Sequence, residues 1–140
     1  MATEFATEKW YEEWCGKLNN HDQYGDQAAG WGVDFNGDFV MVYKADDRLP
    51  EDKYFHVQLE DGECRGVQEV DDPDDVDAGY KYKGEYTNWV RVNEGEVGPM
   101  AAMNAGLFDI EGDMQKIMEY AESSSALSEV GQEIDTEYPY

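Results

Sequence analysis

The sequence predicts an α+β domain, a five-stranded antiparallel sheet with helices packed on one face. Three observations indicate this class. Apolar residues recur at helical spacing near both ends of the chain, they alternate with polar residues in its middle, and Asp61-Gly62 supplies a hairpin turn between two alternating runs. The 140 residues contain no long Ser, Gly or Pro linker. We therefore expect one domain over residues 1–126 and a loosely docked acidic tail over 127–140.

Two helices are expected at the start of the chain. Trp10, Trp14 and Leu18 stand four residues apart within the segment 3–18, and this spacing places them on one face of an amphipathic helix. A shorter helical stretch follows over 22–29, where it ends at a glycine.

Strands are expected in the middle of the chain. The Asn36-Gly37 dipeptide indicates a hairpin with a short arm before it and the apolar strand 38–44 after it. The run 54–60 then alternates apolar and polar residues, and 63–70 should return as its antiparallel partner across the Asp-Gly turn.

The last third of the chain changes its hydrophobic period several times. Pro99 suits a first helical position, Gly106 can end a helix, and Asp113 can accept the free N–H groups of a new one. We expect, in order, a strand over 78–83, a helix over 88–94 capped by Thr87, a helix over 99–105, a strand over 107–111 and a helix from Asp113 onward.

The charge is strongly acidic along the whole chain, with 33 acidic residues, 10 basic residues and a formal net charge of −23. Like charges about 7 Å apart repel by roughly 0.6 kcal/mol in water, and concentrated salt screens that repulsion. We therefore predict a salt-adapted cytoplasmic protein from a halophile. The same charge excludes nucleic acid as a partner and disfavours docking on anionic lipid headgroups. No apolar run is long enough for stable membrane insertion, and no leader peptide is recognisable.

Residues that carry chemistry form no recognisable catalytic or metal-binding motif. Cys15 and Cys64 are far apart in the sequence, and in a reducing compartment we expect them to be buried free thiols. The aspartates of 71–77 lack the pattern of a calcium loop and are interpreted as a solvated connection. We expect no metal, no cofactor and no enzymatic activity. A small hydrolase would need His56 as its base, the one histidine that falls on a predicted strand.

The stretch 95–114 resembles the sterol carrier protein 2 family of lipid-binding domains. The family pattern is G-x-x-x-P-x-x-A-x-x-x-G-x-L-x-I-x-G-D/N-M, and here a phenylalanine, Phe108, replaces its leucine. The matching residues are Gly95, Pro99, Ala102, Gly106, Ile110, Gly112, Asp113 and Met114. The resemblance extends over roughly 10–120 and suggests a member from a halophilic archaeon.

This resemblance implies an apolar tunnel between sheet and helices that takes a fatty-acyl chain, a sterol or a similar lipid; for a halophilic archaeon an isoprenoid lipid replaces the sterol. Apolar residues that pattern alone assigns to the core would then line the tunnel. The expected lining residues are Phe39, Met41, Phe55, Val57, Tyr80, Tyr82, Trp89, Met100, Met103, Phe108, Ile110, Met114, Ile117 and Met118. The alternative function is an interaction module that docks on a lipid-metabolising partner enzyme or forms a homodimer.

Overall fold

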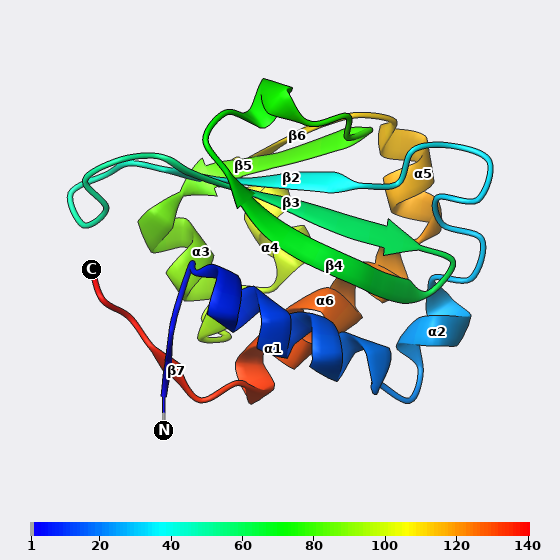
Figure 1. Cartoon of the computed structure of the whole chain (residues 1–140), viewed down its shortest axis with the longest axis horizontal. Coiled ribbons are helices and arrows are strands. Elements are labelled where there is room, and N and C mark those ends of the chain that lie inside the picture. Colours follow the sequence, from blue (N-terminus) through cyan, green and yellow to red (C-terminus); the bar gives the residue numbers. More distant parts are fainter. Residues whose placement is uncertain (1) are drawn as a thin grey trace.

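A computed structural model describes residues 2–140, except the side chains of Pro99, Met100, Ala121, Ser124 and Ser125. A five-stranded sheet is covered on one face by helices, with α1 (Glu8–Asn19) and α6 (Ala121–Glu133) lying side by side (Figure 1). The strand order is β4-β3-β2-β5-β6. The strands are β2 (Phe39–Lys44), β3 (Lys53–Glu60), β4 (Glu63–Val70), β5 (Tyr80–Glu85) and β6 (Phe108–Glu111). The shorter helices are α2 (Tyr24–Gln27), α3 (Tyr86–Asn93), α4 (Pro99–Asn104) and α5 (Met114–Glu119).

The sheet is mixed, which corrects the expectation of a purely antiparallel one. Strands β2 and β3, β3 and β4, and β5 and β6 pair antiparallel, whereas β2 and β5 pair in parallel. Strand β4 ends at the far end of the sheet from where β5 begins, so the connection 71–79 must run back along the sheet. This connection contains the 3-10 turn η1 (Pro73–Asp75), and Figure 1 shows it on the far side of the sheet from α1 and α6.

The hairpin at Asp61-Gly62 is confirmed. Both residues have positive φ, 49° and 78°, and β4 has the bounds that alternation predicts. The hairpin expected at Asn36-Gly37 is wrong, because the segment before β2 forms a loop rather than a strand. Gly37 is needed there for a different reason: a Cβ atom would lie 2.5 Å from the indole nitrogen of Trp31, which donates to the Gly37 carbonyl at 2.8 Å.

The two ends of the chain pair with each other. Strand β1 (Thr3–Glu4) runs parallel to β7 (Thr136–Glu137), and α6 continues to Glu133. The expectation of a loosely docked tail over 127–140 is therefore wrong. Leu127, Val130 and Ile134 keep helical spacing toward the core, and the last two are buried, although the acidic residues between them obscure the pattern in the sequence.

Cys15 and Cys64 form a disulfide, so the expectation of free thiols is also wrong. The bond joins α1 to β4, the strand at the edge of the sheet. The Asn19 amide adds two hydrogen bonds to the main chain of Cys64, donating to its oxygen at 2.9 Å and accepting from its N–H at 2.8 Å. These links hold the C-terminal half of α1 against the start of β4.

Asp46 ties the loop after β2 to the first turn of α3. Its carboxylate accepts the N–H groups of Arg48, Leu49 and Thr87 at 2.8–3.0 Å. Partial desolvation raises the pKa of Asp46, but these hydrogen bonds outweigh it and lower the pKa from 3.8 to about 2. Thr87, expected to cap α3, instead donates its N–H to Asp46, and α3 begins at Tyr86 without a side-chain cap.

Replacing Asp46 with alanine should lower the free energy of unfolding by about 1–3 kcal/mol, because three main-chain N–H groups lose their acceptor. Since folding lowers the Asp46 pKa, its stabilisation is complete above the ordinary carboxyl pKa and is lost as the pH falls toward about 2. Denaturant unfolding at several pH values should show the difference from wild type shrinking below about pH 4. Asp47→Ala, at the exposed neighbouring residue, is the control and should change little. A constant difference across this pH range would contradict the assignment.

Candidate functional site

An apolar cavity of about 130 Å³ lies between the helical layer and the sheet. Its floor is a row of side chains in register on neighbouring strands, with Met41 beside Tyr82 and Tyr82 beside Ile110. Its lining comes from both layers and comprises Phe5, Trp10, Tyr11, Trp14, Tyr24, Trp31, Phe39, Met41, Tyr43, Leu59, Tyr82, Trp89, Val92, Asn93, Met103, Phe108, Ile110, Ile117, Tyr120, Ser123, Leu127, Ser128 and Gly131. Aromatic rings dominate this set.

The aromatic walls are held by ring-to-ring packing. Trp89 stacks on Tyr43 with centroids 4.4 Å apart and meets Phe108 edge-on at 5.0 Å. Trp31 lies parallel to Phe39 at 5.8 Å. Such pairs add about 0.5–1.5 kcal/mol each beyond the burial of their area. The rings therefore form a firm wall rather than a set of loose side chains.

All four tryptophans have their indole N–H groups occupied. Trp10 donates to the Thr136 hydroxyl at 3.0 Å. Trp14 donates to the Leu127 carbonyl at 3.0 Å and Trp31 to the Gly37 carbonyl at 2.8 Å. The Trp89 N–H is shared between the carbonyls of Val42 and Gly84, at 3.0 and 3.2 Å. A tryptophan with a satisfied N–H presents only its apolar ring to its surroundings. The indoles therefore present apolar ring atoms, and no unpaired N–H group, to the cavity.

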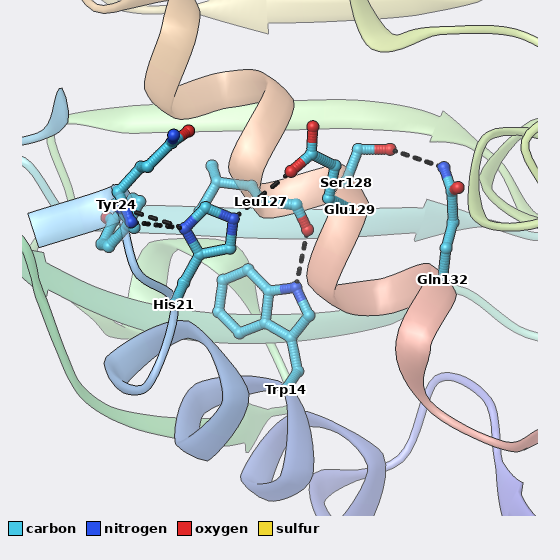
Figure 2. A network of polar contacts seen from close by, with 8 residues as sticks. Trp14, His21, Tyr24, Leu127, Ser128, Glu129 and Gln132 are labelled. Atoms are coloured by element: carbon cyan, nitrogen blue, oxygen red, sulfur yellow. Dashed lines mark hydrogen bonds and ion pairs between the residues drawn. The ribbon is translucent and has the colours of Figure 1, made fainter.

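Polar contacts of α1, of α6 and of the segment leading into α2 hold these helices together (Figure 2). The Trp14 indole of α1 donates to the Leu127 carbonyl of α6 at 3.0 Å. His21 accepts the N–H groups of Gln23 and Tyr24 at Nδ1, while its Nε2 lies 3.3 Å from a Glu129 carboxylate oxygen. The Nδ1 bonds require the tautomer with its proton on Nε2. His21 therefore positions the wall residues of α2 and α6 and does not itself line the cavity.

Tyr11 and Tyr43 meet inside the protein through a hydrogen bond between their hydroxyl groups. Tyr11 comes from α1 and Tyr43 from β2, and both side chains are buried. Burial raises the pKa of each phenol well above its ordinary value, so both stay protonated through the physiological range.

The structure places eight of the predicted lining residues at the cavity. They are Phe39, Met41, Tyr82, Trp89, Met103, Phe108, Ile110 and Ile117. Met100 was also predicted, but its side chain lies outside the described part of the structure.

Five other predicted lining residues do not reach the cavity, so that expectation is wrong for them. Phe55 and Val57 are fully buried on β3, and Phe55 packs against α1, since the centroid of the Tyr11 ring lies 4.8 Å from that of its own ring. Tyr80 is buried beneath Trp31, 5.0 Å away between centroids.

Met114 and Met118 are exposed, at 41% and 55%. Helix α5 is only six residues long and turns Ile117 inward, so these two flanking methionines point outward. The methionine cluster that the sequence suggests is therefore divided between the cavity and the surface.

Sequence reasoning missed the contribution of the N-terminal segment and α6. The aromatic spacing of Trp10 and Trp14 was visible, but it indicated only a helix face, not what that face covers. Besides these two, the missed lining residues are Phe5, Tyr11, Tyr24, Trp31, Tyr43, Leu59, Val92, Asn93, Tyr120, Ser123, Leu127, Ser128 and Gly131.

His56 lies on the other face of the sheet. It alternates with Phe55 and Val57, which face the helices, and its Nε2 lies 2.9 Å from an Asp38 carboxylate oxygen. Among the described residues, no three His, Cys, Asp or Glu side chains are grouped closely enough to hold a metal ion. Across residues 2–140, none of the helices has the length and apolar character needed to cross a bilayer.

Comparison with known proteins gives the family. The crystal structure of sterol carrier protein 2 aligns with a TM-score of 0.82 and 26% identity, over 94% of this chain and 99% of that one. The solution structure of a conserved hypothetical protein from Thermus thermophilus, described as a candidate sterol carrier protein, aligns with a TM-score of 0.82 and 25% identity, over 100% of this chain and 96% of that one.

A more distant structure shows the fold alone. The sterol carrier protein domain 2 of Helicoverpa armigera aligns with a TM-score of 0.59 and 12% identity, over 92% of this chain and 95% of that one. No curated protein matches the chain by sequence. Residues 45–123 match the model of the SCP-2 sterol transfer family. Since this match covers more than half of the chain and the fold agrees, the protein belongs to the SCP-2 sterol transfer family.

Proposed function

We propose that this protein binds and carries a long apolar lipid, of the fatty-acyl or isoprenoid type, in the cavity between sheet and helices, without catalysing a reaction on it. The observation that carries the proposal is the wall itself: a cavity lined by aromatic and aliphatic side chains whose four indole N–H groups are already bonded. Such a wall stabilises a bound apolar chain mainly by removing it from water.

The cavity must widen to take a whole lipid. Its volume of about 130 Å³ resembles that of an engineered cavity that holds one benzene, whereas drug-sized ligands occupy roughly 300–1,000 Å³. Helix α5 is the element best suited to move, because it is one short helix that contributes Ile117 to the wall while Met114 and Met118 face solvent. Its displacement would open the wall without breaking a strand pair.

The energetics favour loose but useful binding. Burying a chain of about 16 carbons at roughly 0.8 kcal/mol per methylene gives about 13 kcal/mol. Association costs roughly 4–15 kcal/mol in lost freedom, and displacing α5 costs more. We therefore expect modest affinity and broad tolerance of chain length.

Native mass spectrometry of the protein purified in concentrated salt tests this proposal. We expect a fraction of the protein to carry an added mass that organic solvent removes, and the extract to contain a long-chain lipid. Protein without added mass that also fails to bind a displaceable apolar dye would refute the proposal. The alternative function, in which this chain docks on a partner enzyme or forms a homodimer, would appear in the same spectrum as a higher assembly mass.

The proposed halophilic origin gives a second expected result. With a net charge of −23, the folded chain should lose stability steadily as KCl is diluted, because close carboxylates repel by about 0.6 kcal/mol per pair once screening is removed. Urea unfolding at a series of KCl concentrations measures this. Sucrose at matched osmolarity is the comparison: it stabilises folded proteins by exclusion from their surface but leaves charges unscreened, so it should restore less of the stability than KCl does. Equal stability at very low and high ionic strength would contradict salt adaptation and the cytoplasm of a halophile as the protein's setting.

A further inference from the structure

Among the described residues, the cavity lining contains no Lys, Arg, His, Asp or Glu side chain. Its polar side chains are tyrosine hydroxyls, two serines and one asparagine. The serine Oγ of Ser123 is bonded to the Tyr120 carbonyl at 2.7 Å, and the Asn93 amide donates to the Tyr138 hydroxyl at 2.9 Å. A buried carboxylate or phosphate needs a cation or several N–H donors to offset its lost hydration.

Several cations of the described residues are engaged with other groups. Lys83 pairs with Glu111, and Arg91 pairs with Glu96 at 3.2 Å. Lys53 donates to the Ala6 carbonyl at 2.8 Å. Lys116, next to the lining residue Ile117, holds its ammonium 4.5 Å from the centre of the Phe35 ring. The acidic surface adds a repulsive field for any anion that approaches the cavity.

The Tyr11–Tyr43 pair supplies a polar group that the fold does not use up. Two hydroxyls carry two protons, and the single bond between them uses one. Tyr11 and Tyr43 are only 3% and 1% exposed, so the second O–H group does not donate a hydrogen bond to solvent water. Both residues line the cavity. Burial keeps both phenols in the protonated state, because it raises the pKa of each. One hydroxyl is thus left with an O–H that can donate to a ligand oxygen.

We propose that this cavity selects an uncharged lipid bearing a hydroxyl or carbonyl oxygen over an anionic lipid of the same chain length, and that the Tyr11–Tyr43 pair donates a hydrogen bond to that oxygen. The inference rests on the proposed function and names the chemical class of its ligand. Fatty-acid anions and acyl groups with charged carriers are then poor ligands, whereas long-chain alcohols, ketones and esters are good ones.

The test is displacement of a neutral apolar dye, N-phenyl-1-naphthylamine, from the full chain in concentrated KCl at about pH 8. The competitors are decanoate, methyl decanoate, decanol and decane. We expect decanoate to bind at least about tenfold more weakly than its methyl ester, because only the carboxylate is charged at this pH. Affinities of decanoate and the ester within about threefold of each other would overturn the proposed selectivity.

The double variant Tyr11→Phe/Tyr43→Phe tests the hydrogen bond. Removing both hydroxyls leaves no unpaired partner, so the variant should fold. The ratio of decanol affinity to decane affinity should fall about threefold to tenfold relative to wild type. Tyr54→Phe removes a tyrosine hydroxyl on the other face of the sheet, outside the cavity lining, and should leave the ratio unchanged. An unchanged ratio in the double variant, or an equal fall in Tyr54→Phe, would overturn the role of the pair.

The two proposals fail in different ways. If the dye does not bind and no competitor acts, the proposed lipid-binding function fails and the ligand class fails with it. If the dye binds and decanoate competes as well as the ester, lipid binding stands and only the selectivity is wrong. The comparison of decanoate with its ester needs no variant, so it decides the question even if the double variant does not fold.

Discussion

Replacing Met103 with glutamate should abolish lipid uptake, whereas the same replacement at Met118 should leave uptake intact. Met103 lines the cavity and is half-buried, so a glutamate directed into the cavity would place its carboxylate in an apolar space without a partner. Burying it without compensation costs about 2 kcal/mol or more, which corresponds to at least about a 30-fold loss of affinity. Met118 is 55% exposed, so its carboxylate would remain in water.

The two variants form a matched pair, because each changes one methionine to the same acid and adds the same charge. Dye-displacement titration gives the affinity, and far-UV circular dichroism verifies that each variant is folded. Uptake retained by a folded Met103→Glu variant would move the binding site away from this cavity. Loss of uptake in Met118→Glu would instead implicate the outer surface of α5.

Removing the disulfide should have the largest effect on stability. Cys15 and Cys64 are 49 residues apart, and a cross-link closing a loop of this length restricts the unfolded chain by about 4 kcal/mol. The bond also holds α1 against β4, and α1 supplies Trp10, Tyr11 and Trp14 to the cavity. We therefore expect the reduced protein to be less stable and to bind the apolar dye more weakly.

Urea unfolding with and without a reductant measures this effect. The variant Cys15→Ala/Cys64→Ala should show the lower stability in both conditions, because it has no bond to reduce. A reductant effect of the same size in that variant would mean that the reductant acts elsewhere. Equal stability of oxidised and reduced wild type would show that the cross-link contributes nothing to folding.

Local features of the fold were predictable because short-range chemistry decides them. Asp61-Gly62 adopts the positive φ angles of a tight hairpin, and the adjoining strand has its predicted bounds. Asp113 accepts the N–H groups of Gln115 and Lys116 and starts α5 as expected. These residues determine conformation within four or five positions of themselves, so one sequence is enough to recognise them.

Long-range features escaped prediction because alternation says nothing about which strands become neighbours. Hairpin signals link consecutive strands, and nothing in Tyr80–Glu85 marks its parallel pairing with β2. The spacing between Cys15 and Cys64 likewise does not reveal that α1 packs against β4. Periodicity identified buried positions such as Phe55 and Val57 correctly, but a residue beneath a helix and a residue beside a cavity have the same pattern.

The candidate site was predicted in part for the same reason. The predicted lining residues of β5, β6, α3 and α4 lie in or near the segment that resembles the family, and most of them line the cavity. The opposite wall is built by α1 and α6, whose aromatic and small residues carry no motif. A single sequence, taken alone, does not show that Trp14 and Leu127, 113 positions apart, form one wall.

The parallel pairing of β2 with β5 also sets an order for folding. Strands β2, β3 and β4 are consecutive and can form a meander early, whereas β5 docks only after the connection 71–79 has been laid across the sheet. Until then β2 presents an open edge whose residues Phe39 to Tyr43 are all apolar. Such an edge invites pairing with another unfinished chain. Refolding should therefore be most prone to aggregation in this interval, and the acidic surface would keep unfinished chains apart.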